Sequence, residues 1–292
     1  MRVFVTGATG FIGSATVQDL IGAGHQVLGL ARSDASADAL ALLGAEAHRG
    51  DLTDLDSLVA GARACDGVIH TAFIHDFSQF MANIETDRRA VEAMTRALEG
   101  SNKPIAIASG TLMVAQGRLA TEADTSPDPN AGRAAAETRV LNTKGVLGSV
   151  VRLPPTVHGA GDHGFVPRLV AAAREKGVSP YVGDGANRWP AVHRLDAARV
   201  FRLAVERGAT GALHAVGEEG VPMRQIAETI GAGLGVPVRS IAPDEAPAHF
   251  DFLAMFVATD NPTSSAATRS KLGWTPQGPD LLTDMRDNGY FS

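Results

Sequence analysis

The sequence predicts an α/β protein with a doubly wound parallel sheet and a smaller lobe toward the C-terminus. Three observations predict this fold. Strand-like runs alternate with helical stretches from the N-terminus to the middle of the chain, as in a parallel sheet covered by helices. A glycine-rich turn directly follows the first strand-like run. The chain has 292 residues, enough to bury a large core.

The first strand and the turn after it predict a dinucleotide site. Val3–Val5 are β-branched or aromatic, as a buried parallel strand requires. Gly7, Gly10 and Gly13 follow, before an amphipathic helix over Ser14–Ile21. Such glycines permit a tight turn, close approach of backbone N–H groups to a pyrophosphate, and close helix packing. The helix N-terminus favours phosphate binding. The alternative is an ordinary tight turn between a strand and a helix.

Composition and charge argue against several classes of protein. The chain has 26 basic and 32 acidic residues, a formal charge of −6 and no basic run, so we expect no nucleic-acid partner. No apolar run approaches the roughly 20 residues that a membrane span needs. Cys65 is the only cysteine, which excludes an intramolecular disulfide and a multi-cysteine metal site. Because no signal peptide precedes the first strand, we expect a cytoplasmic protein.

The glycine spacing carries a family resemblance. Within Thr6–Gly13, two residues separate the first two glycines. This pattern resembles the signature of the short-chain dehydrogenase/reductase family, particularly its extended and atypical branches, which have a Rossmann fold. The resemblance implies that an NAD(P) cofactor lies on the turn and contacts Thr9, Phe11 and Ile12 together with the three glycines.

The end of the second strand indicates which dinucleotide binds. This strand is expected over His25–Ala31 and is followed by Arg32 and Ser33. An NAD-selective site usually has an acidic residue here for the ribose 2′-hydroxyl, and none occurs from His25 to Ser33. Arg32 and Ser33 suit a 2′-phosphate. We therefore expect NADP(H) in preference to NAD(H). Alternatively, Arg32 is solvated and Asp34 caps the following helix.

The next two strands lead to the same edge of the sheet. A third strand over Ala45–Arg49 precedes Asp51 and Leu52, which the resemblance places beside the adenine. These two residues could instead form a turn and helix cap. A fourth strand and its exit cover Gly67–Ala72. Since the carboxyl ends of parallel strands face the ligand crevice, we expect four residues along the cofactor: His70, Thr71, Ala72 and Phe73. His70 could equally be a hydrogen-bonded core histidine.

The following loop and helix suggest substrate and subunit contacts. His75 and Asp76 lie where the loop would enter the substrate crevice. A long helix is expected over Ser78–Leu98. Its charged face consists of Glu85, Asp87, Arg88, Arg89 and Glu92, a pattern typical of solvent or interface surface. In the resembled family this helix often builds a dimer interface, so a homodimer is an expectation.

The fifth strand, Lys103–Thr111, has a polar end and resembles the family strand that carries a catalytic serine or threonine. Ser109 and Thr111 are both candidates, and the register favours Thr111 as the catalytic hydroxyl, with Ser109 beside the cofactor. A hydroxyl here would hydrogen-bond a substrate carbonyl or alcohol. Alternatively, the small residues only permit a tight turn.

The family's catalytic Tyr-x-x-x-Lys pair is missing, because neither of the two tyrosines precedes a lysine by four residues. On the helix expected over Pro127–Glu137, alignment puts Arg133 at the lysine position and Pro129 at the tyrosine position. Arg133 could hold the nicotinamide ribose or a substrate oxyanion, but it cannot act as a base. Arg133 and Glu137 could also form a helical ion pair.

The sixth strand and its exit, Gly148–Gly159, resemble the family's Arg-Leu-x-x-x-Tyr-Gly segment. The resemblance implies that Pro154 and Thr156 line the nicotinamide. His158 stands at the tyrosine position and is the best titratable candidate for a proton donor. Alternatively, His158 packs or binds passively.

The second half supplies the substrate lobe. We expect the Rossmann domain over residues 1–158, returning at about 190–216, and the lobe over 159–189 and 217–292. Phe165 and Trp189 indicate an apolar pocket, and Arg188 is the evident cation for a substrate diphosphate. Helices are expected around Met223–Leu234 and Asp244–Val257, and the C-terminal end resembles the helix that closes over the site in extended members of the family.

These features predict an NADP(H)-dependent oxidoreductase that transfers hydride to or from a small carbonyl or alcohol substrate, without a metal. In this hypothesis Thr111 orients the carbonyl, Arg133 steadies charge, and His158 or water supplies the proton. A second hypothesis is an NADP(H)-sensing binding protein without turnover. A third is a nucleotide-sugar epimerase or dehydratase with bound NAD, which would need a base that the sequence does not show.

Overall fold

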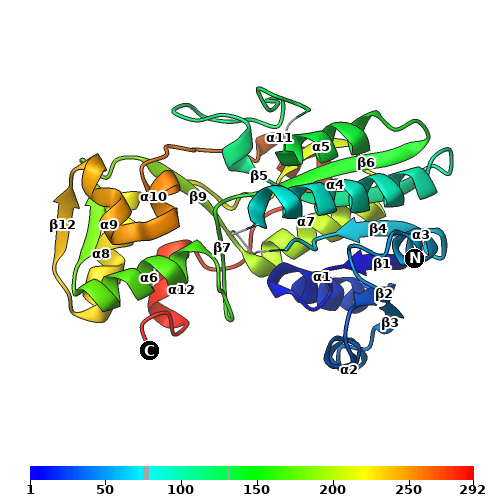
Figure 1. Cartoon of the computed structure of the whole chain (residues 1–292), viewed down its shortest axis with the longest axis horizontal. Helices are drawn as coiled ribbons and strands as arrows, with labels where there is room; N and C mark the ends of the chain where they lie inside the picture. The colour runs from blue at the N-terminus through cyan, green and yellow to red at the C-terminus, as the bar shows by residue number, and fades with distance from the viewer. Residues whose placement is uncertain (75–78, 131) are drawn as a thin grey trace.

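The computed structural model describes residues 1–74, 79–130 and 132–292. A seven-stranded sheet forms the larger domain, with the order β10-β6-β5-β4-β1-β2-β3 (Figure 1). Every neighbouring pair in it is parallel. The strands are β1 (Arg2–Thr6), β2 (Gln26–Ala31), β3 (Glu46–Arg49), β4 (Gly67–His70), β5 (Lys103–Gly110), β6 (Val146–Leu153) and β10 (Gly211–His214). The predicted doubly wound α/β fold is confirmed.

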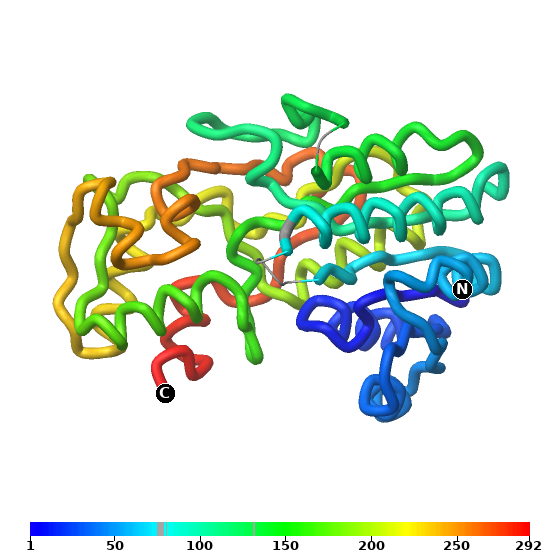
Figure 2. Tube along the Cα trace, viewed as in Figure 1, coloured from blue at the N-terminus to red at the C-terminus, as the bar shows by residue number. Residues whose placement is uncertain are grey.

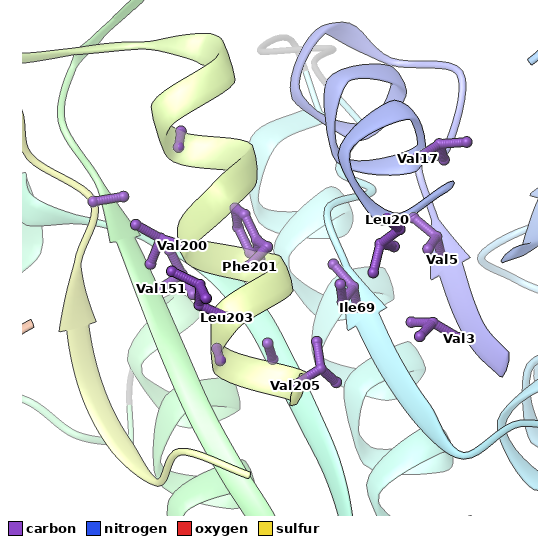
Figure 3. Packing of buried hydrophobic residues seen from close by; sticks show 14 of the residues in the cluster. Val3, Val5, Val17, Leu20, Ile69, Val151, Val200, Phe201, Leu203 and Val205 are labelled. Atoms are coloured by element: carbon purple, nitrogen blue, oxygen red, sulfur yellow. The ribbon is translucent and has the colours of Figure 1, made fainter. Parts of the chain in front are cut away.

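Alternate residues of the strands face two helical layers. Val3, Val5 and Ile69 point toward α1 (Phe11–Gly22) and α7 (Arg194–Glu206), where Phe201 packs against them (Figure 3). Phe4 and Val68 belong to the opposite core, with the second helical layer. That layer is made of α3 (Leu55–Arg63), α4 (Phe80–Ala97) and α5 (Gly132–Asn142), and the short α2 (Asp34–Leu42) follows β2. The two-residue period of a strand therefore gives the sheet two buried faces.

A smaller lobe has its own apolar core (Figure 1). The strands β7 (Thr156–His158), β9 (Arg188–His193) and β11 (Glu218–Pro222) form one sheet, and β8 (Ser179–Val182) pairs with β12 (Val238–Ile241). The helices are α6 (Phe165–Lys176), α8 (Met223–Leu234), α9 (Ala246–Phe250), α10 (Ala254–Val257) and α12 (Leu281–Asp287). The 3₁₀ helices are η2 (Thr111–Met113), η3 (Pro243–Glu245) and η4 (Asp251–Leu253).

The chain crosses back to the larger domain between α10 and α12 (Figure 2). Helix α11 (Ala266–Leu272) packs on α7 and β10. Trp274 is buried in the core between the sheet and α7, and its indole N–H donates to the Asp196 carbonyl at 3.2 Å. The sequence prediction assigned this stretch to the lobe, whereas the structure uses it to join the two parts.

Two helices differ from their predicted bounds. Helix α5 begins at Gly132 rather than Pro127, and residues before proline disfavour helical backbone. The helix expected over Asp244–Val257 is divided into η3, α9, η4 and α10. The division occurs at Asp251, whose φ of 48° is left-handed and incompatible with a continuing right-handed helix. Within the described residues, no helix is long and apolar enough to cross a membrane.

The packing of α1 gives a stability prediction. A Cβ atom at Gly13 would lie 1.9 Å from the Gly7 carbonyl oxygen, whereas a Cβ at Gly22 of the same helix meets no atom within 4 Å. We expect Gly13→Ala to lower the free energy of unfolding by about 3 kcal/mol or more. The control Gly22→Ala should raise it by up to about 1 kcal/mol, through helix propensity. Urea denaturation measures both; equal midpoints for the two variants would contradict the packing argument.

Candidate functional site

The glycine-rich turn lies at the centre of the carboxyl edge of the sheet. Gly7 has a φ of 68°, and a Cβ there would lie 2.6 Å from the Ala72 nitrogen. The Gly10 N–H donates to the Gly7 carbonyl at 2.9 Å, which closes the turn. Gly13 packs on Gly7 from the other side. Strand order reverses between β1 and β4, so this edge is the topological switch point at which doubly wound folds bind ligands.

The start of α1 fits a phosphate group. Its N-cap, Gly10, makes no side-chain cap, and the first turn holds no acidic residue. Thr9 and Gly10 are exposed, while Phe11 and Ile12 are half-buried. The first backbone N–H groups of a helix have no intrahelical partner and carry a positive dipole. The uncapped turn therefore has the geometry of a dinucleotide diphosphate site.

The end of β2 presents an exposed cation, Arg32. Arg32 is exposed and makes no hydrogen bond or ion pair with any described residue. The Ser33 hydroxyl caps α2 by accepting from the Ser36 N–H at 3.2 Å, so Ser33, rather than Asp34, is the helix cap. Asp34 instead forms an ion pair with Arg49 at the end of β3. Arg32 also interacts electrostatically with the Asp51 carboxylate after β3, which accepts hydrogen bonds from Thr53.

Asp51 is hydrogen-bonded within its own turn. Its carboxylate accepts from the Thr53 hydroxyl at 2.7 Å and from the Thr53 N–H at 2.6 Å, and these bonds lower its pKa. Leu52 is half-buried against the core beneath α3 and α4. Both residues form the turn before α3, whose cap is Asp54. Their placement beside an adenine stays a prediction.

His70 is a buried core residue, with only 1% of its surface exposed. Its Nδ1 lies 2.7 Å from the Thr6 hydroxyl, and its Nε2 lies 3.0 Å from Asp87 Oδ1. Both ring nitrogens are therefore used inside the protein. His70 is therefore the hydrogen-bonded core histidine of the alternative interpretation, and its buried ring, bonded to Thr6 and to Asp87 of α4, does not line the cofactor.

Asp87 is buried, although the sequence predicted that it lies on a solvent or interface surface of its helix. It is 3% exposed and contacts His70, whereas Glu85, Arg88 and Glu92 form the exposed ion pairs that the pattern predicts. Asp87 falls in line with the buried Ala90, Val91 and Met94 at helical spacing. That shared apolar face was the signal by which the buried carboxylate could have been found.

The exit of β4 packs on the glycine turn. The Thr71 hydroxyl donates to the Thr6 carbonyl at 2.8 Å, and Ala72 touches Gly7. Phe73 lies half-buried beneath Arg133, whose guanidinium carbon is 4.6 Å from the ring centroid. His75 and Asp76, predicted at the substrate crevice, lie outside the described residues.

Thr111 has a structural role rather than the predicted orienting role. The residue is fully buried, and its hydroxyl donates to Asn261 Oδ1 at 2.7 Å. The Asn261 amide returns hydrogen bonds to the carbonyls of Thr111 at 3.3 Å and Ala115 at 2.8 Å. Because the hydroxyl is buried and already donates its proton, it cannot reach a substrate carbonyl. Asn261 is far along the chain, and no sequence signal identified it.

Arg133 lies at the carboxyl ends of β4 and β5. Its guanidinium donates to the Ala108 carbonyl at 2.7 Å, and its Nε is 3.9 Å from Asp87 Oδ2. Ser109 follows Ala108; it is buried, and within the described part of the chain its hydroxyl has only the Met113 sulfur as a partner, at 3.8 Å. Arg133 thus binds the backbone of the residue directly before Ser109, at the carboxyl end of β5.

The predicted Arg133–Glu137 ion pair does not form. Glu137 instead binds Arg152 of β6, with Nη2 and Oε2 2.8 Å apart and both side chains buried. This pairing joins α5 to the sheet and leaves the Arg133 guanidinium at the edge. The helical ion pair, which the sequence offered only as an alternative, does not form, because a buried partner on the sheet is available to the carboxylate.

His158 does not fit the role of proton donor. It is fully buried, and its Nδ1 lies 2.8 Å from Asp284 Oδ2. Burial lowers the pKa of His158, so the ring is neutral at pH 7. A neutral ring that donates from Nδ1 has only a lone pair at Nε2, and that atom has no partner among the described residues. His158 therefore joins β7 to α12.

The remaining nicotinamide-side residues are also buried. Pro154 is inaccessible, and the Thr156 hydroxyl donates to the Pro190 carbonyl between β7 and β9. Thr156 thus has a structural bond where the resemblance implied a cofactor contact.

The predicted substrate residues lie in the small lobe. Phe165 stacks on Phe256 with ring centroids 5.5 Å apart and lies 5.7 Å from Trp189. Trp189 is fully buried, and its indole N–H has no partner among the described residues. Arg188 is not free to bind a diphosphate, because its Nε and Nη2 contact the Asp260 carboxylate at 3.0 and 2.9 Å.

Comparisons with known proteins agree with this geometry. A family described as the NAD dependent epimerase/dehydratase family matches residues 3–217. An uncharacterized protein of Schizosaccharomyces pombe is 48% identical over 295 residues, covering 100% of both chains. A 2-alkyl-3-oxoalkanoate reductase of Stenotrophomonas maltophilia is 34% identical over 81% of this chain and 77% of its own length.

Solved structures share the fold at low identity. A dTDP-glucose 4,6-dehydratase of Streptomyces venezuelae, solved with NAD, has a TM-score of 0.76 and 20% identity, covering 100% of this chain and 96% of that chain. The human epimerase family protein SDR39U1, solved with NADPH, has a TM-score of 0.74 and 20% identity, covering 99% of each chain. These likenesses confirm the architecture of both lobes.

The Thr111 contact gives a second stability prediction. Thr111→Val removes the hydroxyl and leaves a buried Asn261 oxygen unpaired, so we expect the free energy of unfolding to fall by about 1–3 kcal/mol. Thr111→Ser keeps the hydroxyl donor, so its free energy of unfolding should fall by less than that of Thr111→Val. Denaturant titration of the three proteins measures this order. A valine variant as stable as the wild type would show that the hydroxyl is not engaged with Asn261.

Proposed function

The chain belongs to the NAD-dependent epimerase/dehydratase family and is an NAD(P)-dependent oxidoreductase, and from this premise we propose that it uses NADP(H) to reduce, or reversibly oxidise, a small apolar carbonyl compound. The observation that carries the proposal is the carboxyl edge itself. Neighbouring strands end there, and at their ends lie the uncapped start of α1, the exposed Arg32, Ser109 and Arg133.

The choice of NADP(H) is supported by the end of β2. A 2′-phosphate brings negative charge, and Arg32 offers a guanidinium that no described carboxylate neutralises by an ion pair. Asp34, the nearest acid in sequence, is held by Arg49 and belongs to α2. The residues from His25 to Ser33 include no acid to accept from a 2′-hydroxyl, which disfavours NAD.

In this proposal, Arg133 and Ser109 contact the substrate at the end of the site where hydride is transferred. When bound, NADPH supplies the hydride that reduces the carbonyl carbon. Arg133 holds a permanent positive charge at the end of β5, fixed by the Ala108 carbonyl and the Asp87 carboxylate. That charge stabilises a developing oxyanion. Ser109 is buried, and among the described residues its hydroxyl donates only to the Met113 sulfur at 3.8 Å, a weak bond that a substrate oxygen would replace.

The proton comes from water in this proposal. Arg133 keeps its proton at every relevant pH. His158 is neutral and buried, with its one N–H directed at Asp284. Loss of a positioned general acid typically lowers a rate by about 10²–10⁴-fold. We therefore expect modest turnover compared with family members that have the Tyr-Lys pair.

The apolar lobe supports an apolar substrate. Phe165, Phe256 and Trp189 form an aromatic cluster at the beginning of α6, and Arg188 is occupied by Asp260. The name of the Stenotrophomonas relative, an oxoalkanoate reductase, agrees with a substrate of this class. A homodimer and a cytoplasmic location also stay proposals.

A second candidate function is NADP(H) sensing without turnover. The specific observation in its favour is that Thr111, at the position of the family's catalytic hydroxyl, and His158, the candidate proton donor, are both fully buried and bonded within the protein. Ser109 and Arg133 at the strand ends favour the reductase.

Hydride transfer can be tested with NADPH deuterated at the transferring carbon, in separate samples labelled on each face of the nicotinamide. Incubated with the protein and a metabolite extract, one label should appear in a product detected by mass spectrometry. Arg133→Met should slow labelling by about 10- to 100-fold, since it removes oxyanion stabilisation, while Thr111→Val should retain it per folded molecule. Tight NADPH binding without label transfer from either face would favour the sensor.

Cofactor preference gives a separate prediction. Arg32→Ala should weaken NADPH binding by about 10- to 100-fold, the value of one or two charge-assisted hydrogen bonds, and leave NADH binding unchanged. The control Arg63→Ala removes an exposed arginine beside Lys103, at the opposite edge of the sheet. Isothermal titration calorimetry measures the NADPH and NADH affinities of the wild type and of both variants. An equal loss for NADH and NADPH would exclude a 2′-phosphate contact.

A further inference from the structure

Arg194, the first residue of α7, carries a charge that the protein does not neutralise. It is half-buried and has no hydrogen bond or ion pair with any described residue. The other two arginines of α7 are paired: Arg199 binds Asp196 at 2.8 Å, and Arg202 binds Asp19 of α1 at 2.7 Å. Where α1 contacts α7, Asp19 is thus an acidic partner for Arg202, whereas no described acidic residue pairs with Arg194.

The Arg194 side chain lies at the start of α1. Its guanidinium carbon is 5.3 Å from the ring centroid of Phe11, the first residue of that helix. The loop after β7 also surrounds it, because a Cβ at Gly159 would lie 3.1 Å from Arg194 Cγ and a Cβ at Gly161 would lie 3.9 Å from its Nη1. The side chain therefore lies between the glycine-rich turn and the first loop of the small lobe.

Electrostatics at this position require an anion. Arg194 stands at the N-terminus of its own helix and faces the N-terminus of α1, and both helix ends carry partial positive charge. The nearest acid on α7, Asp196, is occupied by Arg199 and by the N–H groups of Gln277 and Gly278 at 2.9 and 2.8 Å. Two positive helix ends and an unpaired guanidinium repel one another unless a negative group lies between them.

We propose that Arg194 binds the diphosphate of the dinucleotide, from the side opposite the backbone N–H groups of α1. This inference rests on the cofactor site of the proposed function and adds a residue from outside the glycine-rich turn. A guanidinium suits the task because its N–H groups can contact two phosphate oxygens at once. Since Arg194 directly follows β9 of the small lobe, cofactor binding also fixes the segment that joins the lobe to the Rossmann domain.

The test compares a ligand that has the diphosphate with one that lacks it. Arg194→Met should weaken NADPH binding by about 10- to 100-fold, the range for charge-assisted hydrogen bonds, and leave 2′-AMP binding unchanged. Arg168→Met is the matched control, because Arg168 also lies over a phenylalanine ring, that of Phe252, at 5.0 Å, but in the small lobe. This control should leave both affinities unchanged. Calorimetry and competition titration measure them.

Each outcome decides between the inference and the proposed function. Unchanged NADPH affinity in folded Arg194→Met would overturn the inference and leave the proposed function standing. An equal loss for NADPH and 2′-AMP would mean that Arg194 only supports the fold, which also overturns the inference. If Arg194→Met does not fold, Arg194→Gln supplies the same comparison. A wild-type protein that binds 2′-AMP and NADPH equally weakly would contradict the diphosphate site itself, and with it the proposed function.

Discussion

The close contact of three backbone segments at Gly7 is the constraint on which the site depends. The exit of β4 passes Gly7 on one side and α1 packs on it from the other, at distances that leave no room for a Cβ at Gly7 or Gly13. Because no side chain separates these segments, the N-terminus of α1 is held at the strand edge with its N–H groups exposed. A phosphate site follows from packing alone, before any charged residue takes part.

Buried polar bonds hold the rest of the molecule around that edge. Thr111 and Asn261 tie the end of β5 to the crossing segment, and His158 and Asp284 tie β7 to α12. Each pair is fully buried, so both partners depend on the other for hydrogen bonding. Thr111 was the candidate catalytic hydroxyl and His158 the candidate proton donor, and in this chain both residues position the second lobe. The chemistry is left to the edge residues Ser109 and Arg133.

The fold could be predicted from the sequence because its signals are local. Glycine spacing, strand composition and the alternation of elements each depend on a few adjacent residues, and all pointed to the same sheet. The side-chain partners could not be predicted in the same way. Whether Glu137 binds Arg133 four residues away or Arg152 on β6 depends on tertiary packing, and the same holds for Thr111 with Asn261. Arg194 was missed because its environment comes from two distant loops.

The central claim is that one dinucleotide spans the carboxyl edge from Arg32, past α1, to Arg133. A crystal structure of the protein with NADP⁺ tests it most directly. The account predicts the 2′-phosphate at Arg32 and Ser33, the diphosphate between the start of α1 and Arg194, and the nicotinamide near Ser109 and Arg133. A dinucleotide bound with its adenosine end away from Arg32, or with its nicotinamide away from Ser109 and Arg133, would contradict the account.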